Sequence, residues 1–595
     1  MKIFLLILFA NFLSFANSSK VIEKALDEKV YNSYIWKSLI HSRNGKPSIK
    51  DKNFLLSTNN FSLKNELILN IQSIYTDIEY KCKFPARYNW LTNKYPNLRI
   101  KNNSFQCKKF NEYLTKTNAS SLDLIFVSEN IKNPSSMMGH IFFKINGFYN
   151  RKKRSNAVSF FTEINHLNIP LLAYESIIKG MPGYFILRPY EKQISSYINN
   201  EERNIWEYRL NLSKEQLTLI YYHLWELKDI NLTYFFTGFN CATIIEDILS
   251  ISSESFYDDK INLFITPKNL VNKANKHRLL NNSKLIPSLE WNLYMLNENM
   301  DDNEMILLIN YMKNYNFKEL LLFIESKKSS NLTINFIDNY SRYLYLKKKS
   351  ISYSNYNIFQ SLVDKFKINN IDFSNYKNPK NNFDSKQISF GSLIKDNMKY
   401  IQLNMLLTGN TINDDNRNYF SENSLKIGNI NLLANNESII INNIDLYSIN
   451  SYLPINKIMT PLSSEIGISY QSQNSNLHLK DNVNVKLGVG VTNKLDEDSF
   501  LYNIINLKVY MNKSFFYPVL RPKIGLNLYE IFNMKSVFTY EYEYNIKNTD
   551  YNFHEIKLNQ SIKVNKNSRI DFIYNMMEGK NKNSTSSSLQ YTYLF

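Results

Sequence analysis

The chain of 595 residues is 44% hydrophobic and 14% aromatic, which is enough to bury several cores, so a multidomain protein is expected. Its net charge of +18 comes from lysines spread along the chain, without a compact cluster of arginine and aromatic residues, so no nucleic-acid partner is expected. The 14 glycines form no phosphate loop and no dinucleotide fingerprint, and we expect no cofactor.

Residues 1–16 have the pattern of a secretory signal peptide. Lys2 is followed by an apolar run from Ile3 to Leu13, and Ser14-Phe15-Ala16 offers a cleavage site between small residues. This run is short for a membrane span, and no later run of about 18 apolar residues exists, so no transmembrane helix is expected. We therefore expect an exported protein in a compartment that permits disulfides.

The chain has three cysteines, Cys82, Cys107 and Cys241. Cys82 and Cys107 are close in sequence and could form one disulfide, which leaves Cys241 as the odd thiol. The alternative is that one of the first two is also free and buried.

Residues 17–120 are predicted to form a helical N-terminal domain. Apolar residues at helical spacing indicate one helix beginning near Tyr31 and a second from Asn65 to Ile78. Pro85 breaks a helix, and a further helical segment follows it. Arg87 stands out because it lies among aromatic residues; the alternative is a solvated or locally paired arginine.

Residues 121–260 read as strands followed by helices, which predicts an α+β domain. Four strands are expected, at Leu122–Val127, Ile141–Ile145, Ala157–Thr162 and Gly183–Arg188. The run Ser213-Lys214-Glu215-Gln216 is a capping box that opens a helix.

The segment Phe236–Leu249 reads as a loop that turns into a helix at Cys241. Gly238 gives the loop backbone freedom, Asn240 is a good N-cap, and isoleucines then recur at helical spacing. The positive end of the helix dipole favours the thiolate, and the N–H groups of the first turn could hold an oxyanion. Cys241 is thus a candidate nucleophile, with a small core cysteine as the alternative.

The best candidate for a general base is His140. It follows a turn of small residues and begins a buried strand, Ile141–Ile145. The alternative is a structural histidine with satisfied hydrogen bonds. One cysteine and one histidine without closely spaced ligand pairs make a poor zinc pattern, so no metal is expected.

This region resembles the Lnb N-terminal periplasmic domain family. The residues that carry the resemblance are Ser136–Phe142, Ala157–Phe160, Gly180–Phe185 with Pro189-Tyr190, and Phe239–Thr243. Cys82–Arg87 with Trp90-Leu91 resembles the helical segment that commonly precedes that domain. More distantly, the early histidine and the late Asn-Cys are similar to circularly permuted papain-like enzymes, relatives of NlpC-type cell-wall peptidases and of lecithin retinol acyltransferase. The closer resemblance covers roughly residues 30–260.

The resemblance implies that Cys241 is the nucleophile and that His140 is its general base and later its general acid. A third polar group should orient the imidazole, and the polar residues that follow along the chain are Ser159, Glu163, Asn165 and His166. We expect His166 or Glu163, the two with the most capable side chains. Attack on an amide or ester carbonyl would give an acyl-thioenzyme, stabilised by the N–H groups around Asn240 and Cys241.

Residues 261–385 are predicted to be a helical connector without chemistry of its own. Three amphipathic segments support this, Met305–Met312, Phe317–Ile324 and Asp338–Lys347. The polar runs Ser350–Asn357 and Lys377–Lys386 predict a loop and a linker.

Residues 386–595 alternate between apolar and polar positions in segments separated by polar turns, which is typical of an antiparallel transmembrane β-barrel. We expect roughly 10 to 12 strands, and an even number. Tyr591, Tyr593 and Phe595 alternate as in the terminal strand of outer-membrane barrels. A soluble antiparallel sheet is the alternative, since it also alternates.

We therefore expect a protein of the periplasm and outer membrane of a Gram-negative bacterium, in contact with outer-membrane lipid. The first hypothesis is a cysteine peptidase, amidase or acyltransferase acting on peptidoglycan, a lipoprotein or a lipid. The second is a non-catalytic barrel, a channel or an anchor, whose periplasmic domain is a plug or a binding module. An enzyme predicts a reactive Cys241 of low pKa near His140, whereas a binding module predicts an inert one.

Overall fold

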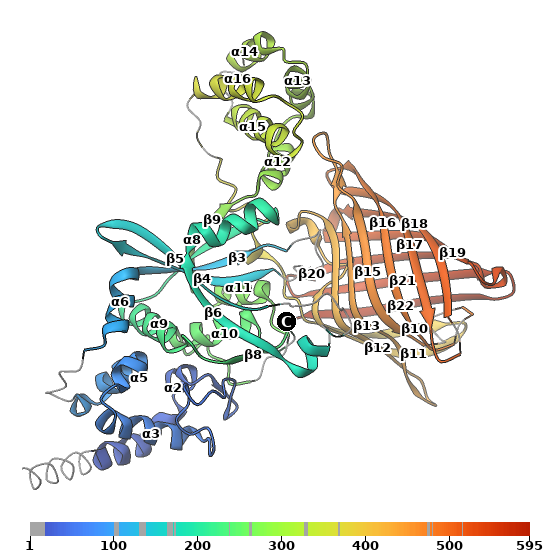
Figure 1. Cartoon of the computed structure of the whole chain (residues 1–595). Helices are drawn as coiled ribbons and strands as arrows, with labels where there is room; N and C mark the ends of the chain where they lie inside the picture. Colours follow the sequence, from blue (N-terminus) through green and yellow to red (C-terminus); the bar gives the residue numbers. More distant parts are fainter. Residues whose placement is uncertain are drawn as a thin grey trace, which may run out of the picture. The chain divides into compact units, whose positions relative to one another are not determined.

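The computed structural model describes residues 18–99, 106–129, 139–163, 171, 174–236, 238–260, 264–326, 331–366, 369, 371–472, 477–478, 480–514 and 516–595. The chain divides into two compact units, Met1–Asn292 with Asp372–Ser374, and Leu293–Ile371 with Asn375–Phe595 (Figure 1). The predicted signal peptide, residues 1–16, lies outside the described residues.

The N-terminal region is helical, as the sequence predicts. Its helices are α2 (Tyr34–Leu39), α3 (Leu63–Thr76), α4 (Tyr80–Lys83), α5 (Pro85–Lys94) and α6 (Lys108–Thr117), with a short hairpin of β1 (Ser42–Arg43) and β2 (Lys46–Pro47). Ser62 caps α3 by accepting a hydrogen bond from the Asn65 N–H at 3.0 Å. Pro85 begins α5, where a missing N–H costs no helical hydrogen bond.

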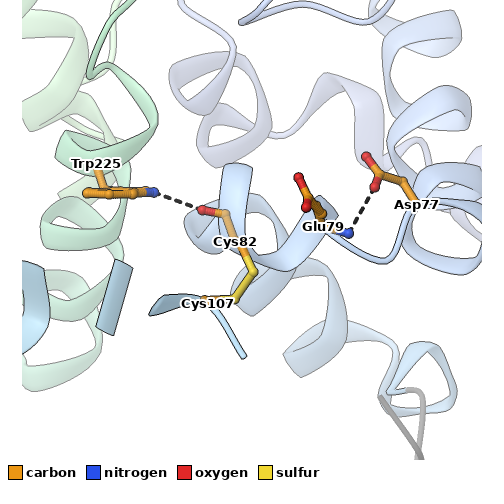
Figure 2. The surroundings of a disulfide bond; sticks show 5 residues. All are labelled: Asp77, Glu79, Cys82, Cys107 and Trp225. Atoms are coloured by element: carbon orange, nitrogen blue, oxygen red, sulfur yellow. Dashed lines mark hydrogen bonds between the residues drawn. A yellow bond between two sulfur atoms is a disulfide. The ribbon is translucent and has the colours of Figure 1, made fainter. Parts of the chain in front are cut away.

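A disulfide joins Cys82 of α4 to Cys107, the residue before α6 (Figure 2). Trp225, from the α+β domain, donates a hydrogen bond from Nε1 to the Cys82 carbonyl at 2.8 Å. The third cysteine, Cys241, is free and buried. The pairing offered by the sequence is therefore the one that the structure contains.

The α+β domain is built on an antiparallel sheet of seven strands in the order β8-β6-β5-β4-β3-β7-β9. The strands are β3 (Ala119–Val127), β4 (His140–Tyr149), β5 (Lys152–Thr162), β6 (Met181–Pro189), β7 (Ile205–Leu210), β8 (Leu232–Tyr234) and β9 (Leu280–Ile286). The helices are α8 (Tyr190–Ser195), α9 (Lys214–Glu226), α10 (Cys241–Leu249) and α11 (Pro267–Lys276), with the π-helical turn η5 (Ser196–Asn200) after α8. The capping box predicted at Ser213 opens α9.

The two faces of this sheet bury different cores. Phe126, Ile141 and Phe143 point into the main core, which they share with α9, α10 and the N-terminal helices. Phe142 and Ile125, their neighbours along the strands, point to the other face and pack on Tyr190 of α8. This alternation is what a strand covered on both faces requires.

Two predictions for the connector are wrong. Residues 280–286 were expected to be helical, but β9 pairs with β7 at the edge of the sheet, because this tertiary pairing outweighs local preference. Ser350–Asn357 was expected to be a loop, but α16 (Tyr353–Asp364) begins inside it. Ser352 caps α16 by accepting from the Asn355 N–H at 3.2 Å, a signal hidden in the polar composition.

The remaining connector helices are α12 (Leu289–Glu298), α13 (Asp302–Lys313), α14 (Phe317–Ser326) and α15 (Asn331–Arg342). They bury regularly spaced apolar residues such as Met305, Leu308 and Met312 of α13. Among the residues that the structure describes, no helix is both long enough and apolar enough to cross a membrane.

The described residues of the C-terminal region form a closed barrel of 12 antiparallel strands, within the predicted range. These strands are β10 (Gln387–Lys395), β11 (Met398–Asn410), β12 (Glu422–Ala434), β13 (Ile439–Tyr452), β15 (Ser463–Gln471), β16 (Asn482–Asp496), β17 (Ser499–Met511), β18 (Phe516–Glu530), β19 (Met534–Asn545), β20 (Phe553–Asn565), β21 (Ser568–Gly579) and β22 (Asn583–Leu594). Pairing of β10 with β22 and of β16 with β17 closes the ring. A further strand, β14 (Pro454–Ile455), makes a short parallel pairing with β16.

The barrel carries its apolar side chains on the outside. On β17, Ile505 and Leu507 are exposed, whereas Ile504, Asn506 and Lys508 are buried. Other exposed apolar side chains on the strands are Phe390, Leu520, Ile524, Phe538, Leu558, Ile570, Phe572, Leu589 and Tyr591. A wall of this kind is suited to lipid and not to water.

The lumen contains buried ion pairs. The Arg521 guanidinium pairs with Glu541 at 2.7 Å, and the Lys523 and Lys486 ammonium groups pair with Glu465 at 2.9 and 2.7 Å. The segment between β11 and β12, residues 411–421, also enters the lumen, where Ile412 packs on Tyr452 and Tyr502. A cavity of about 460 Å³ remains between them.

Candidate functional site

Cys241 is the first residue of α10, as the sequence predicts. Asn240 caps the helix: its side-chain oxygen accepts from the Ala242 and Thr243 N–H groups at 2.8 and 3.1 Å. The N–H of Cys241 is not part of this cap and lies against the residue's own sulfur. The thiol itself is only 5% exposed.

His140 begins β4, also as predicted. Gly139 precedes it with φ +77°, and a Cβ there would lie 2.8 Å from the Phe126 ring and from the Val127 carbonyl oxygen, so this entry to the strand needs glycine. The His140 Nε2 atom lies 2.9 Å from the Ser159 Oγ atom, and the imidazole lies near the Tyr197 ring, with centroids 6.2 Å apart.

Cys241 and His140 line the same pocket, which has a volume of about 400 Å³. The Ile141 N–H, one residue after His140, donates a hydrogen bond to the Cys241 sulfur and stabilises its thiolate form. Polar and charged side chains make up most of the remaining lining, including Ser159, Arg188, Lys192, Gln193, Ser196, Tyr197, Glu201, Arg203, Tyr234 and Asn240.

Burial keeps both candidate catalytic groups neutral at rest. It raises the pKa of the Cys241 thiol to about 11, although backbone N–H groups of Ile141, Ala242 and Cys241 itself oppose the shift. Burial, helped by the positive charge of Arg203, lowers the pKa of His140 to about 3. The thiolate expected from the helix dipole is therefore not favoured, because desolvation outweighs the dipole. In the described part of the chain no hydrogen bond joins the two side chains.

Tyr234 and Arg203 are site residues that sequence reasoning missed. The Tyr234 hydroxyl faces the Cys241 sulfur, and burial together with this neighbour raises the pKa of Tyr234 well above its usual value. Arg203 donates to the Ser128 and Val127 carbonyl oxygens at 2.6 and 3.2 Å, which fixes its positive charge beside the pocket. Neither residue lies in a recognisable motif, and only the sheet pairing brings them to Cys241.

The residue that contacts the His140 imidazole is Ser159. Of the two expected orienting residues, Glu163 is exposed just beyond the end of β5, and His166 lies outside the described residues. In an antiparallel pair, Ser159 of β5 lies on the same side of the sheet as His140 of β4, and this register was the signal that could have selected it.

Over the residues that the structure describes, no cluster of three or more His, Cys, Asp or Glu side chains could hold a metal ion. The pocket itself offers a thiol, an imidazole and several hydrogen-bond donors.

Three family models match parts of the chain. Residues 109–273 match the Lnb N-terminal periplasmic domain, which confirms the resemblance for this region. Residues 28–94 and 376–593 match two domains of unknown function, DUF7843 and DUF7840. A comparison with curated proteins finds no match. The papain-like resemblance stays a prediction.

Several solved outer-membrane proteins are similar to the barrel region alone. A loop-deletion mutant of the outer membrane protein OmpT of Vibrio cholerae is 10% identical, with a TM-score of 0.22, over 35% of this chain and 97% of its own. An anion-selective porin from Comamonas acidovorans is 8% identical, with a TM-score of 0.21, over 35% and 98%. The transport unit of the autotransporter AIDA-I from Escherichia coli is 12% identical, with a TM-score of 0.22, over 36% and 90%.

The protein belongs to the periplasm and the outer membrane. The periplasmic domain family matched by residues 109–273 and the closed barrel with an apolar outer wall together support this location.

Proposed function

We propose that the protein is a cell-envelope thiol hydrolase or acyltransferase, in which Cys241 is the nucleophile, His140 is the base and the barrel is an anchor. The observation that carries the proposal is the shared pocket: Cys241 and His140, from sequence positions about a hundred residues apart, line one cavity of about 400 Å³. A nucleophile at a helix start, with its own backbone N–H beside the sulfur, is a setting suited to acyl transfer.

The proposed mechanism depends on which ring nitrogen of His140 carries the proton. When His140 Nε2–H donates to Ser159 Oγ, Nδ1 is left with a lone pair that can accept the thiol proton. The sulfur then attacks the carbonyl carbon of an amide or ester, and the oxyanion accepts a hydrogen bond from the Cys241 N–H. His140 returns the proton to the departing amine or alcohol, which leaves an acyl-thioenzyme. Water completes hydrolysis, and an amine or alcohol completes transfer.

A thiol pKa of about 11 is the value that the binding-module hypothesis predicts, so the proposal requires that His140 deprotonates Cys241 only during attack. Because Cys241 and His140 are both neutral at neutral pH, no thiolate–imidazolium ion pair is present before attack. Peptidoglycan stem peptides, lipoproteins and acylated lipids are the envelope substrates that carry such bonds.

The contents of the lumen favour an anchor over an open channel. Lys535 of β19 pairs with Glu422 of β12, on the opposite side of the ring, at 2.7 Å, and Ile412 packs on Tyr452 and Tyr502 in the lumen. A barrel of this size can be largely filled by its side chains.

The proposal is tested by trapping the acyl-thioenzyme. The full-length protein in detergent micelles would be incubated with p-nitrophenyl acyl esters and acyl-peptide amides, and the adduct located by mass spectrometry. We expect an acyl group on Cys241, absent in Cys241→Ser, with p-nitrophenol released in a burst of about one equivalent. Release of p-nitrophenol at the same rate by Cys241→Ser, without an adduct, would overturn it.

A further inference from the structure

The side of helix α10 that faces away from Cys241 carries two buried acids, Glu246 and Asp247. At 3.6 residues per turn, Glu246 lies about 140° and Asp247 about 120° around the helix axis from the thiol. Both belong to an unbroken chain of nine ionisable side chains that runs from the N-terminal region into the α+β domain. In order of contact these are Glu66, Arg87, Glu226, His223, His41, Asp247, Arg43, Glu246 and Lys273.

The N-terminal region contributes the two residues that hold α10. Arg43 of β1 donates from Nε to Asp247 at 2.7 Å and from Nη2 to Glu246 at 2.9 Å. His41 approaches Asp247 through Nδ1 at 3.3 Å. Lys273 of α11 completes the set by donating to Glu246 at 2.6 Å. Bidentate contact of this kind fixes direction as well as distance.

The other end of the chain of contacts is equally buried. The Arg87 guanidinium lies between the Phe54 and Phe84 rings, 4.4 Å from each centroid, and its Nε is 3.3 Å from a Glu226 oxygen. Its Nη1 is 3.7 Å from Glu66. The sequence marked Arg87 because it lies among aromatic residues, and these contacts account for it.

One proton lies between the Nε2 atoms of His41 and His223. Their Nε2 atoms are 2.9 Å apart, while each Nδ1 faces a carboxylate, Asp247 for His41 and Glu226 for His223. Carboxylates only accept hydrogen bonds, so both Nδ1 atoms carry a proton. The Nε2–Nε2 contact is a hydrogen bond only if one of the two carries a proton. The pair therefore holds three protons and one positive charge.

That single charge balances the cluster. Four carboxylates, those of Glu66, Glu226, Glu246 and Asp247, face three permanent cations, those of Arg43, Arg87 and Lys273. One shared imidazolium brings the sum to zero, which is what a buried ionic cluster requires. The other titratable groups against it are the hydroxyls of Tyr80 and Tyr257, which burial keeps neutral.

We infer that the N-terminal helical region is an electrostatic clamp that positions the nucleophile helix α10, with the His41–His223 pair as its pH-sensitive joint. His41 and Arg43 are thus positioning residues that act on Cys241 through α10. The inference rests on the proposed function only in that the clamped helix is the one that carries the proposed nucleophile.

Further protonation of the His41–His223 pair should favour opening of the clamp. A fourth proton on the His41–His223 pair places two N–H groups against each other. It also leaves the cluster of nine side chains with an excess positive charge. Burial and the charge of His41 lower the pKa of His223 to about 4, so the closed clamp resists this proton. An opened clamp accepts it near the ordinary histidine value of about 6.5. Above about pH 6.5, opening releases the shared proton, whereas below it the opened pair takes up a further one. Lowering the pH from 6.5 to 5 should therefore favour opening by roughly eightfold.

The test is hydrogen–deuterium exchange of the full-length protein in detergent micelles, followed by mass spectrometry at pH 6.5 and pH 5. Protection of α10 would be corrected for the intrinsic exchange rate and compared with that of β4 in the same domain. We expect Arg43→Gln to lower the protection of α10 about tenfold more than that of β4. Arg43→Gln combined with Asp247→Asn, which removes one charge of each sign, should restore most of it.

Matched controls separate the clamp from general loss of stability. Arg342→Gln removes an exposed arginine paired with Asp338, and His277→Gln removes a histidine at the end of α11. Both should change α10 protection less than twofold. The acid response of α10 should disappear in His41→Gln with His223→Gln.

Three results would overturn the clamp. They are unchanged α10 protection in Arg43→Gln, equal losses in α10 and β4, and an acid response that persists without both histidines. Hydrogen–deuterium exchange does not depend on catalysis. An inactive Cys241 would therefore contradict the proposed function without bearing on the clamp.

Discussion

The two sides of helix α10 differ in what their buried groups contact. On one side, Cys241 and His140 face a pocket, both neutral, with hydrogen-bonding capacity left over for a ligand. On the other side, Glu246 and Asp247 are held by Arg43 in a cluster whose charges cancel. The difference teaches that burial alone does not make a reactive site. The side that we propose to be reactive is the one whose buried groups line a cavity.

Breaking the balanced side should have the largest effect on stability. Arg87→Ala leaves the buried carboxylates of Glu226 and Glu66 without their cation, which should lower the free energy of unfolding of the N-terminal unit by about 3–5 kcal/mol. All five tryptophans lie in that unit, so tryptophan fluorescence in urea reports it alone. Lys116→Ala, at an exposed pair with Glu112 in the same unit, should cost less than about 1 kcal/mol. Equal losses of unfolding free energy in the two variants would show that the buried cluster stabilises the unit no more than an exposed ion pair does.

Acidification should destabilise the protein through histidines on both sides of α10, because the folded state lowers their pKa values. The pKa values of His140 and His223, about 3 and about 4, lie below the unfolded value of about 6.5, so the unfolded chain binds more protons between these limits. Below about pH 6.5 stability therefore falls as the pH drops toward 4, by about 2 kcal/mol for the His41–His223 pair, whereas above pH 6.5 loss of the shared proton on unfolding gives the opposite slope. Unfolding by urea at pH 6.5, 5.5 and 5, followed by tryptophan fluorescence, measures this fall. Stability that rises on acidification from pH 6.5 to pH 5 would contradict both assignments.

The smallest effect is expected at the residue that orients the base. Ser159→Ala removes the hydroxyl 2.9 Å from His140 Nε2 and should slow acylation of Cys241 about tenfold, through loss of one hydrogen bond that sets the tautomer. Ser159→Thr keeps the hydroxyl and should retain most of the rate. Glu163→Gln, at an exposed position, is the control and should leave the rate unchanged. The adduct rate in the acyl ester assay compares the three.

Local signals were predictable and long-range ones were not. The cap at Asn240, the strand start at His140 and the alternating barrel strands depend on neighbours within a few residues, and all three are present. Strand β9 was missed because its partner, β7, lies about seventy residues earlier. His41 reaches Asp247 across 206 positions, a contact that no local pattern encodes.

The candidate site divides in the same way. Cys241 and His140 could be selected because each lies at the start of a regular element, where a side chain is presented in a defined direction. Ser159 required the register of β4 against β5, and Arg203 required the position of the chain between η5 and β7. The thiol pKa was expected to be low from the helix dipole alone, and the structure raises it because the sequence does not show how completely α10 is buried.

The most direct test of the account is the rate at which Cys241 is acylated by an activated ester between pH 5 and pH 9, in wild type and in His140→Ala. A general base in the pocket should accelerate acylation by about 10²–10⁴ at pH 7, and this acceleration should be lost in His140→Ala while the thiol remains. In both proteins simple alkylation should rise with pH without a plateau below pH 9, because the resting thiol has a pKa of about 11. Equal acylation rates in wild type and His140→Ala would contradict the dyad and leave Cys241 a buried structural cysteine.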